Sequence, residues 1–123
     1  ISGVENVVSI GFDRWRIDLF KKACEELGVE LPLVPHGQGF KDMSPALDTL
    51  EAELLNARLT HNGNPCLTMA AANAVVTKDP AGGRKLDKSK ATSRIDPMVA
   101  LTMACGVANL VAEDEPNYDV YVF

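Results

Sequence analysis

The sequence lacks several features that would assign it to a large class of proteins. It has no apolar run approaching the roughly 20 residues of a membrane-spanning helix, so no membrane segment is expected. Its start has no basic segment followed by an apolar core, so no secretory signal is expected in the chain as given. It also has no glycine-rich phosphate loop with the accompanying Lys and Ser or Thr, which argues against an ATPase site. No internal repeat, low-complexity segment or domain boundary is evident before residue 113.

Cysteine is scarce, and its pattern does not indicate a disulfide framework. Cys24, Cys66 and Cys105 are odd in number and lie within apolar helical patterns, which predicts buried free thiols. The net charge of −5 argues against a strongly basic nucleic-acid-binding protein. The remaining composition, 46% apolar and 24% charged residues in a chain of 123, is typical of one globular domain with a single modest core.

Two aspartates stand where the local pattern changes abruptly. Asp13 follows the apolar residues 7–12, which predict a buried strand, and Asp96 precedes the apolar residues 97–112, which predict a core helix. Carboxylates at the ends of buried elements can meet at one edge of a sheet and hold a hard divalent cation such as Mg²⁺. The alternative is structural: each aspartate caps a helix, Asp96 with Pro97 at the first helical position.

Helical and strand patterns alternate between the two aspartates. A helix is predicted over residues 15–27, with Gly28 as its C-terminal cap, and a short edge strand over residues 31–34. Residues 36–40 are predicted to form a loop in which Gln38 can face a ligand.

Three further elements are predicted before the last helix. A helix is expected to begin at Ser44 and Pro45 and to run to about residue 59, and another helix is expected over residues 65–72. A strand over residues 74–78 and a turn over residues 79–83 should follow. The first of these helices is expected to bury Leu47, Leu50, Leu54 and Ala57.

Basic residues gather in a short segment before Asp96. Five of the 12 cationic residues fall within eleven positions, and we call them the basic strip: Arg84, Lys85, Lys88, Lys90 and Arg94. The strip is interpreted either as a solvated polar hairpin or as a surface that contacts nucleic-acid phosphates beside Asp96.

The order of these segments resembles the C-terminal part of the large terminase subunit of tailed bacteriophages. The matching segments are residues 12–15, Gln38 before residues 43–47, residues 59–65, residues 73–76, and residues 88–101 with Lys88, Lys90 and Asp96. They cover roughly residues 5 to 108. The ordered set carries the resemblance, because no single motif is specific.

The resemblance implies an α/β protein with a partial RNase H-like fold, a mixed sheet flanked by helices, over residues 1–112, and a tail over residues 113–123. It implies a metal-dependent endonuclease that cuts concatemeric viral DNA during packaging. Asp13 and Asp96 would be catalytic ligands of Mg²⁺ or Mn²⁺, two ions in the complete site, and the basic strip would contact DNA. The implied partners are double-stranded viral DNA, the small terminase subunit and the portal protein, with no membrane, in the host bacterial cytoplasm.

One departure from the family pattern matters. The family has a first catalytic aspartate on a strand upstream of the one that ends at Asp13, and an ATPase region before it. Neither lies in this chain, so we expect a fragment of a longer parent protein, with an incomplete site that is weakly active or inactive alone. Asp18 and Asp87 are not convincing third ligands, because Asp18 falls among solvent-facing helical positions and Asp87 within the basic strip.

Two other functions remain open from the sequence. One is an RNase H-like nuclease or resolvase with no packaging role. The other is a non-catalytic α/β interaction domain in which Asp13 and Asp96 only cap helices. The distance between the two carboxyl groups distinguishes the interaction domain from a nuclease, because a shared metal site predicts a distance within about 10 Å. A phosphate-loop ATPase upstream in the parent sequence would favour the terminase over the other nuclease.

Overall fold

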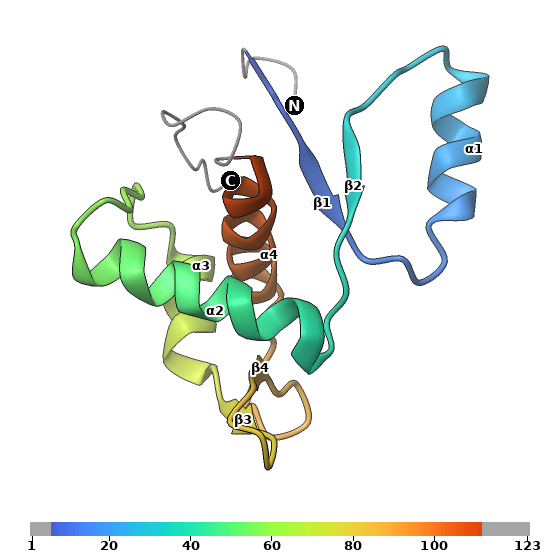
Figure 1. The fold of residues 1–123 in the computed structure, drawn as a ribbon. Coiled ribbons are helices and arrows are strands. Elements are labelled where there is room, and N and C mark those ends of the chain that lie inside the picture. The colour runs from blue at the N-terminus through green and yellow to red at the C-terminus, as the bar shows by residue number, and fades with distance from the viewer. Residues whose placement is uncertain (1–5, 112–123) are drawn as a thin grey trace.

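A computed structural model describes residues 6–111 of the chain, which form four helices and four short strands. In chain order these elements are β1 (Ile10–Phe12), α1 (Asp18–Glu26), β2 (Leu33–Pro35), α2 (Phe40–Leu55), α3 (Pro65–Asn73), β3 (Val76–Lys78), β4 (Arg84–Leu86) and α4 (Asp96–Val111) (Figure 1). No helix within residues 6–111 is long and apolar enough to cross a membrane. The predicted tail, residues 113–123, lies outside the described range.

The strands form two separate pairs. β1 and β2 are parallel, with Ile10 opposite Leu33, and α1 connects them. β3 and β4 form an antiparallel hairpin, with Thr77 opposite Lys85, as the turn residues 79–83 predicted. The strand predicted over residues 7–12 is shorter than expected. Its regular pairing starts only at Ile10, and Val8, before the strand, is 61% exposed.

The core lies where α2, α4 and the hairpin meet. Met43, Leu47 and Leu50 project from one face of α2, and Val99 and Met103 from the facing side of α4. The two helices approach closely: a Cβ atom on Gly106 would lie 2.8 Å from the Cβ of Ala46. Glycine at this position therefore allows a contact between helix backbones that a side chain would prevent.

The start of α2 was predicted wrongly. The helix begins at Phe40 rather than Ser44, and Pro45 lies inside it. Proline at this position removes the backbone hydrogen bond that would reach the carbonyl of Lys41, and its ring crowds that carbonyl, which together cost about 3 kcal/mol in a helix interior. The extra turn buries Met43 to 1% exposure, which contributes about 1.5–3 kcal/mol and offsets much of that cost. The predicted end of the helix, near residue 59, was also wrong, because α2 ends at Leu55. Leu54 and Ala57, which were predicted to be buried, are exposed.

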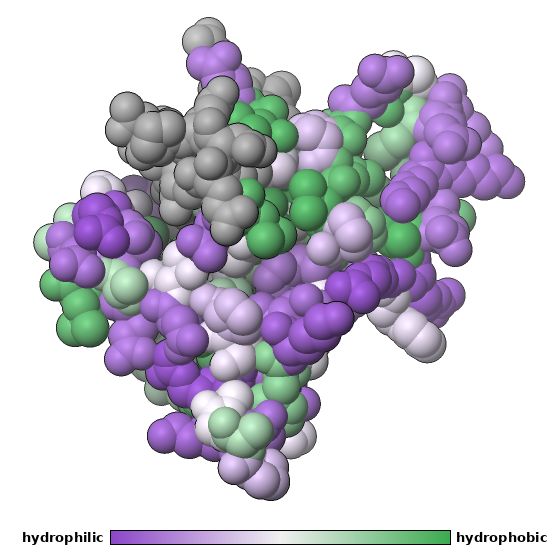
Figure 2. Space-filling view, viewed as in Figure 1, coloured by the Kyte–Doolittle hydropathy of each residue, from purple (hydrophilic) through white to green (hydrophobic). Residues whose placement is uncertain are grey.

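α1 forms where a helix was expected but buries none of its residues. It begins at Asp18, later than predicted, and ends before Gly28, whose φ of +66° is the left-handed C-terminal cap that the sequence predicted. Leu19 and Leu27 are each 78% exposed. Figure 1 shows α1 standing beside β2, away from the other helices, and Figure 2 shows apolar surface gathered over the two parallel strands.

The third helix and the three cysteines were also predicted from the sequence. α3 covers the predicted helix, and the side chain of Asn64 caps it by accepting a hydrogen bond from the N–H of Cys66 at 2.8 Å. The three cysteines are free, as predicted, but their burial differs: Cys105 is buried, Cys24 is half-buried and Cys66 is exposed. The prediction of buried thiols is therefore confirmed for Cys105 and wrong for Cys66.

Candidate active site around Asp13

Asp13 lies directly after β1, where the chain turns toward α1. Its Oδ1 accepts a hydrogen bond from the backbone N–H of Trp15 at 3.1 Å, which closes a tight turn. Arg16 follows with a φ of +55°, an unusual value for a residue with a side chain. Because α1 begins only at Asp18, Asp13 is not its N-cap. The alternative prediction, that Asp13 caps the following helix, is therefore wrong.

A side chain from a distant loop also reaches Asp13. The Nε2 of Gln38 donates a hydrogen bond to Asp13 Oδ2 at 2.7 Å. Each carboxylate oxygen of Asp13 thus accepts one hydrogen bond from the protein, and the plane of the carboxylate is fixed. Gln38 was predicted to face a ligand, and in this structure it faces Asp13.

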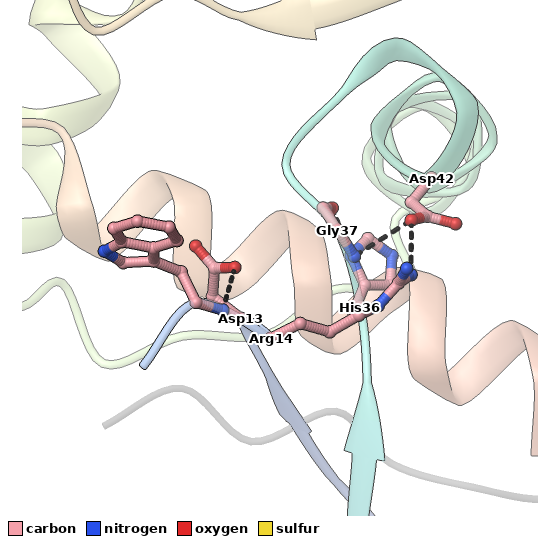
Figure 3. A network of polar contacts seen from close by, with 6 residues as sticks. Asp13, Arg14, His36, Gly37 and Asp42 are labelled. Atoms are coloured by element: carbon pink, nitrogen blue, oxygen red, sulfur yellow. Dashed lines mark hydrogen bonds and ion pairs between the residues drawn. The ribbon is translucent and has the colours of Figure 1, made fainter. Parts of the chain in front are cut away.

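The loop that carries Gln38 is held in place by Asp42 in the first turn of α2. Asp42 Oδ2 accepts a hydrogen bond from the N–H of Gly37 at 3.0 Å and pairs with Arg14 Nη2 at 2.9 Å. Figure 3 shows Arg14 and Gly37 converging on Asp42 while Asp13 faces the turn at Trp15. A Cβ atom on Gly37 would collide with Asp42 Oδ2, so glycine is required for this approach.

His36 is a site residue that the sequence did not identify. It is 5% exposed; its backbone N–H bonds to the carbonyl of Phe12 at 2.8 Å, and its Nδ1–H donates to the carbonyl of Gly37 at 2.9 Å. The ring lies against α4, where a Cβ on Gly106 would be 2.5 Å from His36 Nε2. The only sequence signal was its place in a loop after a short strand, and that signal does not distinguish a buried histidine from an exposed one.

Asp96 is the first residue of α4 and is exposed. The carbonyl of Ile95 accepts the first helical hydrogen bond, from Val99 at 3.0 Å, so Ile95 rather than Asp96 occupies the cap position. The predicted N-cap with Pro97 at the first helical position is thus displaced by one residue. The side chain of Asp96 is 64% exposed and lies 3.5 Å from Lys88 Nζ. A surface pair of this kind contributes about 0–1 kcal/mol.

The members of the basic strip lie in different environments. Arg84 pairs with Asp48 and Glu51 of α2, and these hydrogen bonds, that of Asp48 first, raise the pKa of its guanidinium. The Nζ of Lys85 lies 4.9 Å from the centre of the Phe40 ring. Both side chains therefore attach the hairpin to α2.

The C-terminal half of the strip is more exposed. Lys90 lies 3.8 Å from Asp87 and donates a hydrogen bond to Thr77 at 3.0 Å. Arg94 has no ion pair among residues 6–111. A shallow hollow of about 430 Å³ lies here, lined by residues that include Lys88, Arg94 and Asp96.

The two predicted metal ligands belong to separate groups of contacts. Asp13 bonds to Gln38 and Trp15, Asp96 pairs with Lys88, and no described hydrogen bond or ion pair links the two aspartates. Within residues 6–111 no group of three or more His, Cys, Asp or Glu side chains is placed to hold a metal ion. The donor chemistry still suits a hard cation, because both candidates are carboxylates, but these residues supply only two of the ligands that a two-metal centre needs.

Comparison with known proteins identifies the domain to which this arrangement belongs. The family model described as the endonuclease domain of the terminase large subunit matches residues 1–112. The chain belongs to this family. It is 57% identical, along its whole length, to the terminase large subunit of Enterobacteria phage HK97, and covers 25% of that protein. The protein YmfN of Escherichia coli K12 is 35% identical over 84 residues, 67% of the chain and 18% of YmfN.

A solved structure agrees with the sequence comparisons. The crystal structure of the HK97 bacteriophage large terminase matches with a TM-score of 0.79 and 61% identity, covering 84% of this chain and 22% of that one. The α/β class is thereby confirmed, as is the match to a terminase whose nuclease domain is RNase H-like. The chain spans about a quarter of the length of its HK97 relative.

Proposed function

We propose that this chain supplies part of the metal-dependent endonuclease centre of a phage terminase large subunit, which cleaves concatemeric viral DNA during packaging. One observation carries the proposal: the Asp13 carboxylate, at the end of β1, is oriented by hydrogen bonds to both oxygens, and β1 packs on the helix that begins at Asp96. Oriented carboxylates on regular elements are what a divalent-cation site requires.

The packing of β1 on α4 supports a shared site. A Cβ on Gly11 would lie 2.9 Å from Val107 Cγ2 and 3.7 Å from the carbonyl oxygen of Met103, and the two elements run in roughly opposite directions (Figure 1). The contact places β1 against α4 at Met103 and Val107, and the chain continues from there toward the end of the helix that begins at Asp96. We expect the carboxyl groups of Asp13 and Asp96 to lie within about 10 Å of each other, as a shared pair of cations requires.

The two aspartates would hold Mg²⁺ or Mn²⁺ through their carboxylate oxygens. Cations bound in such a site stabilise the attacking and leaving oxygens of phosphodiester hydrolysis. Within the chain, Asp13 and Asp96 provide the negative charge that attracts the cations, and Gln38 and the N–H of Trp15 keep Asp13 oriented. A two-metal centre needs more than these two ligands, so the proposal places further ligands outside residues 6–111.

The DNA path is proposed to run beside Asp96. Lys88, Lys90 and Arg94 are exposed there, and Lys88 and Arg94 line the hollow next to Asp96. Cationic side chains at such a surface attract phosphates without reading sequence. Arg84 and Lys85 contribute less to DNA binding in this proposal, because both side chains are half-buried against α2. Membership of the family supports the small terminase subunit and the portal protein as partners, and the host bacterial cytoplasm as the location.

The proposal is tested in the full-length parent with Asp13→Asn and Asp96→Asn. An amide keeps the shape of the side chain but lacks the charge that a hard cation requires, so both variants should lose Mg²⁺- or Mn²⁺-dependent cleavage of plasmid DNA while remaining folded. Asp18→Asn is the matched control, since Asp18 is exposed on α1. Full cleavage by either folded site variant would remove that aspartate from the set of ligands.

A further inference from the structure

Gln38 is the only glutamine in the chain, and within residues 6–111 its side chain makes one hydrogen bond, to the carboxylate that we propose as a metal ligand. The Nε2 of Gln38 lies 2.7 Å from Asp13 Oδ2 and comes from a loop 25 residues further along the chain. Trp15 contributes the other hydrogen bond, to Oδ1, from the backbone beside Asp13 itself. Gln38 is therefore the distant side chain that restrains Asp13.

We propose that Gln38 is a positioning residue that orients the Asp13 carboxylate for divalent-cation binding. This inference rests on the proposed function of Asp13. Groups that hydrogen-bond to metal-binding side chains set their orientation, and replacing such a group typically costs about 10–100-fold in metal affinity or activity. A carboxylate oxygen has two lone pairs, so Oδ2 can accept from Gln38 and still bind a cation.

The neutral amide of Gln38 suits this role better than the cation nearby. Arg14 follows Asp13 directly, but its guanidinium is directed to Asp42 at 2.9 Å rather than to Asp13. A guanidinium on Asp13 would compete electrostatically with a metal ion, whereas a carboxamide donates a hydrogen bond and leaves the full negative charge available. The structure thus gives Asp13 an orienting partner without neutralising it.

The support under Gln38 is rigid enough for positioning. The preceding residues are fixed by two independent interactions: the N–H of Gly37 bonds to Asp42, and the buried His36 bonds through its N–H to Phe12. These contacts hold the loop without any contribution from the side chain of Gln38. Removing the carboxamide should therefore release Asp13 without displacing the loop.

The test uses the full-length parent with Gln38→Leu, which keeps most of the volume of the side chain and removes the N–H donor. Mn²⁺ binding is measured by electron paramagnetic resonance, and cleavage is measured as a function of Mg²⁺ concentration. We expect the Mn²⁺ dissociation constant and the Mg²⁺ midpoint to rise about 10–100-fold, with cleavage at saturating Mg²⁺ within about threefold of the unmodified parent. A role limited to loop structure would not move the metal midpoint in this way.

Two variants complete the design. Asn56→Leu removes a side-chain amide at the end of α2, where Asn56 Nδ2 donates a hydrogen bond to the carbonyl of Ala52, and should leave Mn²⁺ binding unchanged. If Gln38→Leu unfolds, Gln38→Ala serves in its place, and the same 10–100-fold rise is expected.

The outcomes separate this inference from the proposed function. Loss of Mn²⁺ binding in Asp13→Asn together with an unchanged dissociation constant in Gln38→Leu would overturn the role of Gln38 and leave the metal site standing. Unchanged Mn²⁺ binding in Asp13→Asn would contradict the proposed function itself, and the inference with it.

Discussion

Asp42 should control the order of the loop that carries Gln38, and replacing it with alanine tests the architecture of the site. The substitution removes two interactions at once. One is the hydrogen bond from the N–H of Gly37 at 3.0 Å, and the other is the ion pair with Arg14 at 2.9 Å. Both converge on the same carboxylate oxygen.

The two interactions differ in magnitude. The Arg14 side chain is 61% exposed, so the ion pair contributes about 0.2–1 kcal/mol. A hydrogen bond to a charged acceptor contributes about 1.5–3 kcal/mol, and the N–H of Gly37 would be left without its partner in Asp42→Ala. Asp42→Asn keeps an acceptor for Gly37 and loses mainly the ion pair, so it should behave like Arg14→Ala and cost about 1 kcal/mol or less.

Hydrogen exchange in the full-length parent measures this difference locally. At about 1.4 kcal/mol per factor of ten, the loss of both interactions in Asp42→Ala should speed exchange of the Gly37 amide by about 20-fold to several hundredfold, while the amides of β3 and β4 keep their protection. Asp42→Asn and Arg14→Ala should change it by less than about fivefold. Equal effects of Asp42→Ala and Asp42→Asn would refute the assignment of the larger share to the hydrogen bond from Gly37.

Three further outcomes are expected. Gly106→Ala should lower the melting temperature of the nuclease domain, because the Cβ of the new alanine would lie 2.5 Å from His36 Nε2. Such overpacking costs about 1–3 kcal/mol, which exceeds the roughly 1 kcal/mol that alanine gains over glycine in helix propensity. Burial raises the pKa of Cys105 to about 11, so iodoacetamide at about pH 8 should leave this thiol unmodified. The free energy of unfolding should also fall between about pH 9 and 11, because the thiol ionises at a lower pH in the unfolded chain than in the folded one. Lys88→Ala with Lys90→Ala should weaken DNA binding for all sequences and lower the salt slope by about two units.

The cysteine and lysine predictions each have a control, and all three have an outcome that would contradict them. The exposed Cys66 should be alkylated in the same sample in which Cys105 is protected, and equal reaction of both would contradict the burial of Cys105. A double substitution of the exposed Lys22 and Lys41 removes the same charge elsewhere and should change the salt slope less. An unchanged slope in the Lys88 and Lys90 variant would mean that this part of the strip is only solvated surface. A higher melting temperature in Gly106→Ala would show that the helices separate without cost.

Much of the fold followed from local patterns, and the errors have physical causes. Turn residues 79–83 and the left-handed cap at Gly28 are determined by nearby backbone geometry, so the hairpin and the end of α1 were predictable. The start of α2 was not, because the usual penalty for proline within a helix favoured a start at Pro45, and the tertiary burial of Met43 that offsets this penalty is not visible in a local pattern. The helical period also predicted α1 but did not reveal that its apolar side chains stay exposed.

The candidate site was predicted only in part. Asp13 was recognised because it follows an apolar run, but its hydrogen bond with Gln38 joins residues 25 positions apart, and no local pattern indicates such a contact. The ion pair between Arg14 and Asp42 also joins residues far apart in the sequence, and it depends on the packing of the loop against α2. Among the five basic residues, composition could not separate Arg84, which pairs with two acids, from Arg94, which lies exposed beside Asp96.

Anomalous X-ray diffraction from crystals of the full-length parent soaked in Mn²⁺ tests the shared metal site most directly. A shared metal site predicts Mn²⁺ bound to a carboxylate oxygen of Asp13, the Gln38 hydrogen bond retained on Oδ2, and the Asp96 carboxyl group within about 10 Å of that of Asp13. Mn²⁺ bound elsewhere, with the two carboxyl groups on opposite faces of the domain, would contradict the proposed endonuclease centre.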